Sequence, residues 1–454
     1  MHQPSDDVGC PTRGADAVVT RLSMGPPKTC IIGAGISGIA AMRSLQRAGL
    51  PFVCFEAGSG IGGLWRIGND NGMSHIYQTL HTNTSRERTG FSEHPMPDDY
   101  PDFPSHRQVL EYLDDVVDRF DLRKNVRFRH RVEHVGRRTD GGFAVTVTRP
   151  DGSHQLEAFD VMVVANGHHW DPYFPKPEGT FSGRMIHSNE YERPIDFAGQ
   201  RVLIVGAGNS ACDIASDLAG IADRVAMSTR RGAHVVPKYV LGRPIDQWTS
   251  NFMSRLPRFV QRGLFQFLLF LARGSQTSYP FPRPSNPLGT DHPTISSDIL
   301  NLVGHGKVMV HPEIEWVKGN EVRFTDETEE SFDVIITATG FNVAIPFLDD
   351  EMVRVADNRV DLYRHVVHPG VDRLYFVGLV QPLGAVAPLV EAQADWIADL
   401  ITGRCKVPDR DVMWQVIKSE RERIQSQYVH TRRHTLEVDF FGYLREISQE
   451  RTAK

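Results

Sequence analysis

The sequence lacks the features that mark several protein classes. It contains no Cys-x-x-Cys pair, and its five cysteines are scattered, so a disulfide framework, a zinc ribbon or a dithiol redox motif is not expected. Basic residues are not in excess, because 50 Lys and Arg against 56 Asp and Glu give a net charge of −6, which argues against a nucleic-acid partner. The N-terminus has no basic stretch followed by an apolar core, so no secretory signal is expected. Together with the cysteine pattern, this favours a cytoplasmic location.

Long hydrophobic runs are also missing. The most apolar stretch is Leu264–Ala272, and its nine residues are too short to cross a bilayer, which needs about 20. We expect this stretch to be a buried helix or a tunnel wall, and a patch that rests weakly on a membrane surface is the alternative. No metal site is expected, and a homodimer is left open.

The sequence has 454 residues, a length that suggests two or three domains, and it contains the same supersecondary unit twice. In 28–56 an apolar run ends in Gly33-x-Gly35-x-x-Gly38, a helical pattern follows, and a second apolar run ends at Glu56. The first glycine makes a tight turn, the second lets the backbone approach a pyrophosphate, and the third lets helix and strand pack closely. The helix N-terminus attracts the phosphates, and Glu56 is placed to accept a hydrogen bond from a ribose 2′-OH. The predicted dinucleotide contacts are Gly33, Ala34, Gly35, Ile36, Ser37, Gly38 and Glu56.

The second unit, 201–231, differs from the first where the ribose would lie. Its turn is Gly206-x-Gly208-x-x-Ala211, and the position equivalent to the acid falls in the Ser-Thr-Arg-Arg run 228–231. A carboxylate would repel a 2′-phosphate, whereas hydroxyls and the Arg230 guanidinium would bind one. The first unit should therefore hold a nucleotide with a free 2′-OH and the second NADP(H), which suggests hydride transfer from NADPH to a bound flavin. The predicted contacts here are Gly206, Gly208, Asn209, Ser210, Ala211 and Arg230.

Two further apolar runs, 160–167 and 333–340, predict buried parallel strands. The charged, periodic segments near 107–119 and 410–425 predict surface helices. The fold class is α/β, with two Rossmann-like dinucleotide-binding domains, the NADP domain being inserted into the FAD domain. The expected divisions are a disordered extension (1–27), the first part of the FAD domain (28–169), the NADP domain (170–329) with a substrate-side insertion at about 237–290, and the second part of the FAD domain with C-terminal helices (330–454).

A longer motif precedes the second glycine-rich turn. It reads Phe181-x-Gly183-x-x-x-His187-x-x-x-Tyr191. With this motif the chain resembles the class B flavin-dependent monooxygenases, and within them the flavin-containing monooxygenases that oxygenate soft nitrogen and sulfur. Other stretches that resemble the family are Gly62–Trp65, Tyr77–Ser85, Asp99–Pro104, Thr337–Phe341, Gly378–Gly384 and Glu391–Gln393.

The resemblance implies a mechanism and further site residues. NADPH would reduce FAD, O2 would add to give a C4a-hydroperoxyflavin, and a soft amine or thioether would take the distal oxygen, as in N,N-dimethylaniline monooxygenase activity. Asn83 matches the family's asparagine and would be the catalytic residue, while His187 would hold the interdomain linker. The further cofactor-binding residues that the resemblance implies are Gly63, Leu64, Trp65, Thr82, Asn83, Thr84 and Gln381.

Two other functions share both nucleotide sites. Baeyer–Villiger monooxygenases, which act on ketones, usually have Trp where this chain has Tyr191. A FAD- and NADPH-dependent electron-transfer reductase would need an exit for electrons, and without a Cys-x-x-Cys pair the dithiol version is not expected.

Overall fold

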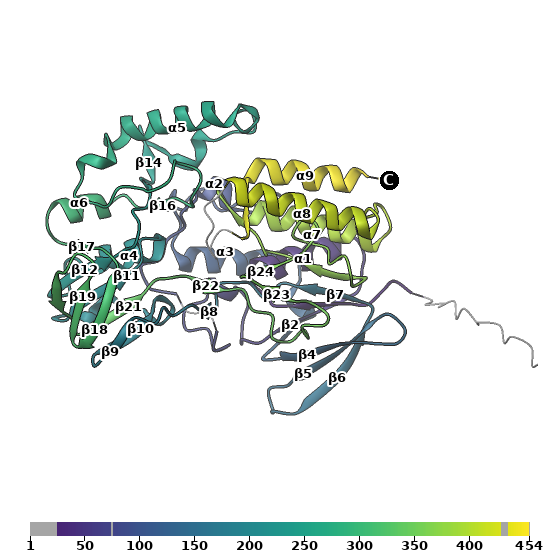
Figure 1. The fold of residues 1–454 in the computed structure, drawn as a ribbon. Helices are drawn as coiled ribbons and strands as arrows, with labels where there is room; N and C mark the ends of the chain where they lie inside the picture. Colours follow the sequence, from purple (N-terminus) through teal and green to yellow (C-terminus); the bar gives the residue numbers. More distant parts are fainter. Residues whose placement is uncertain (1–24, 74–75, 428–434, 454) are drawn as a thin grey trace, which may run out of the picture.

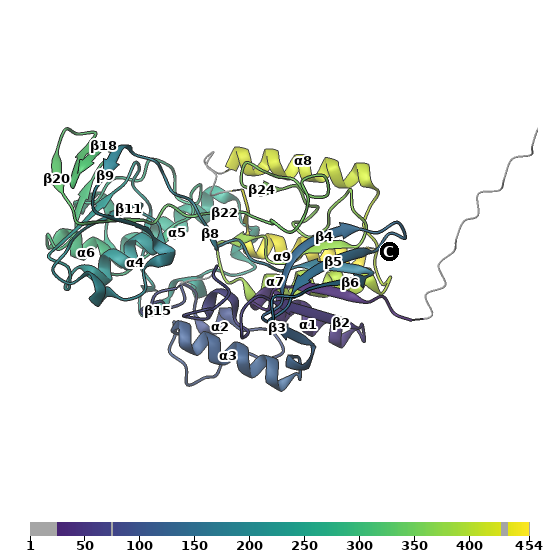
Figure 2. The same ribbon diagram turned by 90° about the horizontal axis from the view of Figure 1, so that it is seen from below.

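The computed structural model describes residues 25–73, 76–427 and 435–453 and shows two α/β lobes (Figure 1). Most of the extension expected at 1–27 lies outside the described residues. Figure 2 shows the two lobes side by side, with the strands around β11 in one and those around β5 in the other. The predicted fold class is confirmed.

The first lobe is built on a parallel five-stranded sheet in the order β25-β7-β1-β2-β3. Its central strands are fully buried runs such as Thr29–Ile32 and Val161–Val164, because helices cover one face and an antiparallel sheet the other. Its elements are β1 (Thr29–Ile32), α1 (Ile36–Arg47), β2 (Phe52–Glu56), α3 (His106–Arg119), β3 (Val126–Phe128), the antiparallel β4 (Arg131–Arg137), β5 (Phe143–Thr148) and β6 (His154–Phe159), β7 (Val161–Val164), β25 (Leu374–Phe376), α7 (Ala387–Ile401), α8 (Arg410–Gln427) and α9 (Phe440–Thr452).

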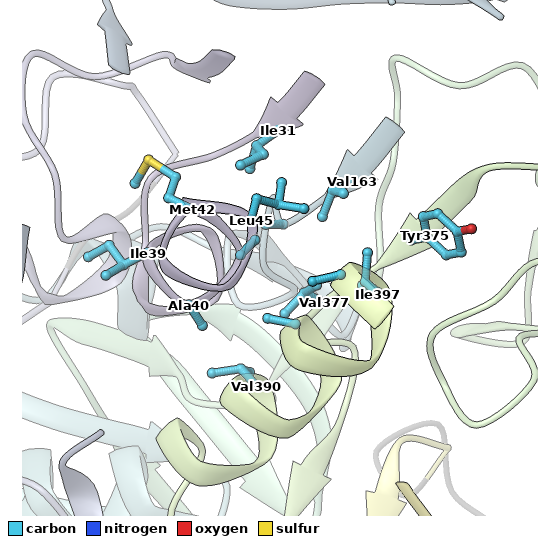
Figure 3. Packing of buried hydrophobic residues seen from close by; sticks show 14 of the residues in the cluster. Ile31, Ile39, Ala40, Met42, Leu45, Val163, Tyr375, Val377, Val390 and Ile397 are labelled. Carbon is cyan, nitrogen blue, oxygen red and sulfur yellow. The ribbon is translucent and has the colours of Figure 1, made fainter. Parts of the chain in front are cut away.

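The core of this lobe lies between the sheet, α1 and α7 (Figure 3). Leu45 of α1 faces Val163 of β7. On α7, Val390 lies near Ala40 of α1, and Ile397 lies near Val377. These side chains are almost fully buried. Since the N-terminal end of α1 follows directly from the glycine-rich turn, this packing fixes the turn.

The second lobe repeats the same plan. Its parallel sheet has the order β10-β21-β11-β12-β17, and α4 crosses from β11 to β12 as α1 crosses from β1 to β2. A mixed sheet, β20-β19-β18-β9, covers one side; β18, β19 and β20 are antiparallel neighbours, and β9 runs parallel to β18. The elements are β9 (Glu178–Phe181), β10 (Arg184–His187), β11 (Arg201–Val205), α4 (Asn209–Leu218), β12 (Arg224–Ser228), α5 (Arg258–Arg273), α6 (Ile299–Gly304), β17 (Met309–His311), β18 (Ile314–Gly319), β19 (Glu321–Phe324), β20 (Glu329–Ser331) and β21 (Val334–Thr337).

The pairing of β21 places one domain boundary later in the sequence than expected. The prediction placed 330–454 in the first lobe, but β21 pairs with β10 and β11 of the second sheet, as β7 pairs with β1 in the first. The second lobe therefore extends past Thr337. Its two ends lie side by side in a short ribbon, where β8 (Asp171–Pro172) pairs with β22 (Phe341–Asn342).

The apolar stretch Leu264–Ala272 forms most of α5, and the expectation that it is buried is wrong. Leu269 is the one buried residue of this helix, whereas Phe267 is 59% and Phe270 61% exposed. Figure 1 shows α5 along the outer edge of the second lobe, with β14 (Tyr239–Val240) beneath it. Within the described parts of the chain, no helix is long and apolar enough to cross a bilayer.

Candidate functional site

A cleft of about 1550 Å³ runs between the lobes. Both glycine-rich turns open into it, since each stands at the carboxyl end of its sheet, where α/β folds bind ligands. The first residues of α1 and α4 also line it, so two helix N-termini with free N–H groups face one space.

The three glycines of the first turn are needed for different reasons. A Cβ at Gly33 would lie 2.6 Å from the Ala165 carbonyl oxygen, and one at Gly38 would lie 1.9 Å from the Gly33 oxygen. At these two positions the protein's own backbone leaves no room for a side chain. A Cβ at Gly35 would meet nothing nearer than Gly63 Cα at 3.6 Å, and its backbone φ of −76° suits any residue. Gly35 therefore leaves open a slot that the protein does not fill, which fits the pyrophosphate of a dinucleotide.

Glu56 ends β2 beside this slot and is 4% exposed. Its two carboxylate oxygens accept hydrogen bonds from the N–H groups of Ala34 and Gly58, each at 2.7 Å. Burial raises the pKa of this carboxyl, and the two backbone donors oppose that shift. Each oxygen keeps a second lone pair, so Glu56 can still accept from a ribose hydroxyl.

The second turn matches the first in shape but not in charge. Gly206 has a φ of +135°, and a Cβ there would lie 2.6 Å from the Ala338 oxygen. At the end of β12, Ser228 is buried and donates to the Pro312 oxygen at 2.7 Å, so its hydroxyl is committed within the protein. Arg230 is 77% exposed at its side chain and lies 3.8 Å from Glu313, a loose surface pair. Its guanidinium is therefore available to an anionic ligand in the cleft.

The segment with Asn83 lines the same cleft as the two turns. Asn83 Oδ1 and Thr82 Oγ1 are buried without a hydrogen-bond partner, and both residues line the cleft. Buried polar atoms are nearly always paired, so such atoms indicate a bound partner. An amide oxygen that faces the cleft fits the donor groups of a flavin or nicotinamide ring.

Most predicted site residues meet in this cleft. Ala34, Gly38 and Ala211 are buried behind its wall, where they pack or donate within the turns. The predicted residues that do line it are Gly33, Gly35, Ile36, Ser37, Glu56, Gly63, Leu64, Trp65, Thr82, Asn83, Thr84, Gly206, Gly208, Asn209, Ser210, Arg230 and Gln381.

Sequence reasoning missed two polar residues of the wall. Asn166 and His168 follow β7, and Asn166 Oδ1 and His168 Nε2 are buried without partners. Burial lowers the pKa of His168 to about 4, so its ring is neutral. The signal was present, because the carboxyl end of a parallel strand next to a glycine-rich turn is where a ligand binds.

The histidine of the longer motif lies at the linker between the lobes. His187 is buried; its Nε2 donates to the Gly340 oxygen at 3.0 Å, and its Nδ1 accepts from the Asn189 N–H at 3.2 Å. Burial lowers the pKa of this ring. His187 therefore joins β10 to the chain that leaves β21.

Comparison with known proteins identifies the family. A model of flavin-binding monooxygenase-like proteins matches residues 27–454. The chain belongs to this family. Rat flavin-containing monooxygenase 5 is 34% identical over 442 residues, 94% of this chain and 83% of that protein. Mouse dimethylaniline monooxygenase [N-oxide-forming] 2 is also 34% identical, with the same coverage.

Solved structures of monooxygenases share the fold of this flavin monooxygenase. The S-allyl-L-cysteine S-oxygenase from Allium sativum is 26% identical, with a TM-score of 0.71 over 94% of this chain and 89% of that one. Cyclohexanone monooxygenase with bound epsilon-caprolactone has the same TM-score at 19% identity, over 93% and 97% of the two chains, and bears on the fold alone. The predicted cofactors FAD and NADP(H) agree with the family and with the two turns.

Proposed function

We propose that this protein is an NADPH- and O2-dependent monooxygenase that transfers one oxygen atom to a soft nitrogen or sulfur nucleophile. The observation that carries the proposal is the unpartnered, buried Asn83 amide oxygen on a cleft with two different dinucleotide turns. The named relatives that form an N-oxide or oxygenate sulfur support this substrate class.

The chain's own residues bind and orient the reactants. FAD, when bound, accepts hydride from NADPH and activates O2. The first turn and Glu56 hold FAD, while Arg230 and the second turn hold NADP(H). Asn83 fixes the orientation of the groups that meet at the cleft, and no acid or base is required of it, because the substrate lone pair attacks oxygen directly. One oxygen atom goes to the substrate, and the other leaves as water with the hydride of NADPH and a proton.

The test is NADPH consumption with a panel of tertiary amines, thioethers and ketones, with the products identified. We expect N-oxides or sulfoxides to form in amounts that match the NADPH consumed. Lactones or esters from ketones as the main products would instead identify a Baeyer–Villiger enzyme. NADPH oxidation that requires an added electron acceptor would identify a reductase.

Arg230→Ala should raise the KM for NADPH and leave that for NADH nearly unchanged. The guanidinium is exposed at the end of β12 and pairs loosely with Glu313, so its main partner is the 2′-phosphate. A charge-assisted hydrogen bond is worth about 1.5–3 kcal/mol, or roughly ten- to a hundred-fold in affinity. Steady-state kinetics with both cofactors measure this, and Arg323→Ala on β19 of the same lobe is the control. An equal loss with NADPH and NADH contradicts the assignment.

We also propose a cytoplasmic location with weak contact between α5 and an anionic membrane surface. Cys30, Cys54 and Cys405 are free and buried, which suits a reducing compartment. Phe259, Leu264, Phe267, Phe270 and Leu271 form one exposed apolar face of α5. The range 247–290 has five arginines and no acid or lysine, so it attracts anionic lipid. A second copy of the chain across a two-fold axis would instead bring the same arginines together, and their charges would repel.

Replacing Phe267 and Phe270 by glutamate should abolish binding to vesicles that contain phosphatidylserine. Each buried Phe is worth roughly 1.5–3 kcal/mol, so the loss is measurable by co-sedimentation. Leu156→Glu on β6 is the control, because Leu156 is also apolar and is 70% exposed. Binding that survives both α5 substitutions, or a dimer that they dissociate, contradicts the membrane proposal.

A further inference from the structure

The segment that carries Asn83 belongs to the first lobe by sequence but packs on the second. Tyr77 lies in the hydrophobic core of the second lobe and partly buried Leu80 packs against it; the Tyr77 ring centroid is 5.8 Å from that of Tyr191. The Gln78 N–H donates to the Glu192 oxygen at 3.0 Å. The segment 76–85 is therefore attached to the lobe that carries the NADP turn.

Two carboxylates of α4 hold the start of this segment. The Tyr77 hydroxyl donates to Asp213 at 2.8 Å. The Thr79 hydroxyl donates to Asp217, which also accepts from the Tyr191 hydroxyl at 3.3 Å. Both carboxylates are on the helix that begins at the NADP turn, so the turn and the segment share one rigid element.

Two charged residues near the start of the 237–290 insertion hold the backbone on either side of Asn83. Lys238 Nζ donates to the Thr82 carbonyl oxygen at 3.1 Å. Asp246 Oδ2 accepts from the Ser85 N–H at 2.7 Å and from its hydroxyl at 2.9 Å. The Thr82 N–H donates to the Pro104 oxygen of the first lobe at 2.9 Å, so Thr82, the residue before Asn83, is held from both lobes.

These contacts decide where the Asn83 side chain points. Asn83 Oδ1 has no partner of its own within the described structure, so its direction follows from the backbone that carries it. A reacting group displaced by about 1 Å can cost a hundredfold in rate. Lys238 and Asp246 do not line the cleft, and so they act on Asn83 through the backbone alone.

We infer that Lys238 and Asp246 are positioning residues that orient Asn83, and that Asp213 and Asp217 attach the same segment to the NADP-binding helix. The inference rests on the proposed function of Asn83. It adds that the second lobe, and not only the first, sets the geometry of the oxygenation site.

The test compares Lys238→Met, which keeps the apolar stem and removes the donor, with Lys238→Arg, which keeps a donor. In the holoenzyme, Lys238→Met should leave flavin reduction by NADPH near the wild-type rate. The share of consumed NADPH that appears as hydrogen peroxide should rise several-fold, and Lys238→Arg should largely restore coupling. Lys318→Met, an exposed lysine on β18 of the same lobe, is the matched control. Asp246→Asn, tested in parallel, should uncouple the enzyme in the same way.

Hydrogen–deuterium exchange gives a readout that does not depend on turnover. The amides of 80–85 should exchange faster in Lys238→Met than in the wild type, with exchange in β11 and α4 unchanged. Faster exchange throughout the second lobe would indicate general destabilisation and overturn the inference. If Asn83→Ser uncouples the enzyme but Lys238→Met and Asp246→Asn do not, the inference fails while the proposed function stands. If Asn83→Ser behaves as the wild type, the proposed role of Asn83 fails, and with it the positioning role.

Discussion

Asn83→Ser should retain NADPH binding and flavin reduction but lose nearly all oxygenation of substrate. Reduction depends on the two nucleotide turns, which the substitution does not touch. Oxygenation depends on an amide oriented into the cleft, and the shorter serine hydroxyl does not reach the position of the unpartnered Asn83 Oδ1. Released hydrogen peroxide should then account for the NADPH that is still consumed. Stopped-flow absorbance of the reduction step and peroxide assays at steady state measure the two halves separately.

Asn320→Ser is the matched control for this substitution. Asn320 is exposed on the turn between β18 and β19 and does not line the cleft. This variant should couple NADPH use to oxygenation as the wild type does. An Asn83→Ser enzyme that oxygenates substrate normally would show that Asn83 is only a turn residue.

Gly35→Val should give folded protein without flavin. A Cβ at Gly35 would lie 3.6 Å from its nearest neighbour, Gly63 Cα, and the backbone φ of Gly35 is ordinary. The protein itself therefore tolerates a side chain at this position. A bound pyrophosphate would clash with the valine side chain, because its close approach to the backbone requires a residue without a Cβ. Purified Gly35→Val should be colourless, with wild-type circular dichroism and no heat of FAD binding by titration calorimetry. Flavin released from the wild type should be FAD and not FMN.

Gly33→Val separates this effect from misfolding. At Gly33 the Cβ would lie 2.6 Å from the Ala165 oxygen, and the φ of +99° is unfavourable for any β-branched residue. This variant should lose soluble folded protein as well as flavin. A Gly35→Val protein that retains yellow colour would show that the pyrophosphate does not occupy the slot.

The sequence predicted the parts of this protein that depend on local chain geometry. The turns at Gly33 and Gly206 were recognisable because tight turns, crossover helices and buried strands have their own residue patterns. The charge difference between Glu56 and Arg230 could also be read directly. The boundary after β21 was missed because a buried parallel strand has the same pattern in either sheet, and only pairing assigns it to one.

Tertiary contacts explain the other differences. The apolar run in α5 was expected in the interior, but hydropathy does not tell which face of a helix finds a partner, and here Phe267 and Phe270 find none within the described chain. The contacts of Lys238 and Asp246 with the Asn83 segment join residues more than 150 positions apart. No spacing rule predicts such pairs, because they exist only once the lobes are docked.

Because of the β8–β22 ribbon, we expect the second lobe to be exchangeable between relatives. Both ends of the inserted chain leave the first lobe at one point, where Pro172 pairs with Phe341, so excision of 173–340 leaves termini that a short linker could join. Insertions with adjacent ends can be transplanted between scaffolds without strain on the host. Chimaeras that take this lobe from a relative should therefore change nicotinamide preference and substrate range in a single step. They should remain coupled only when the donor lobe also supplies counterparts of Asp213, Lys238 and Asp246 for the recipient's 76–85 segment.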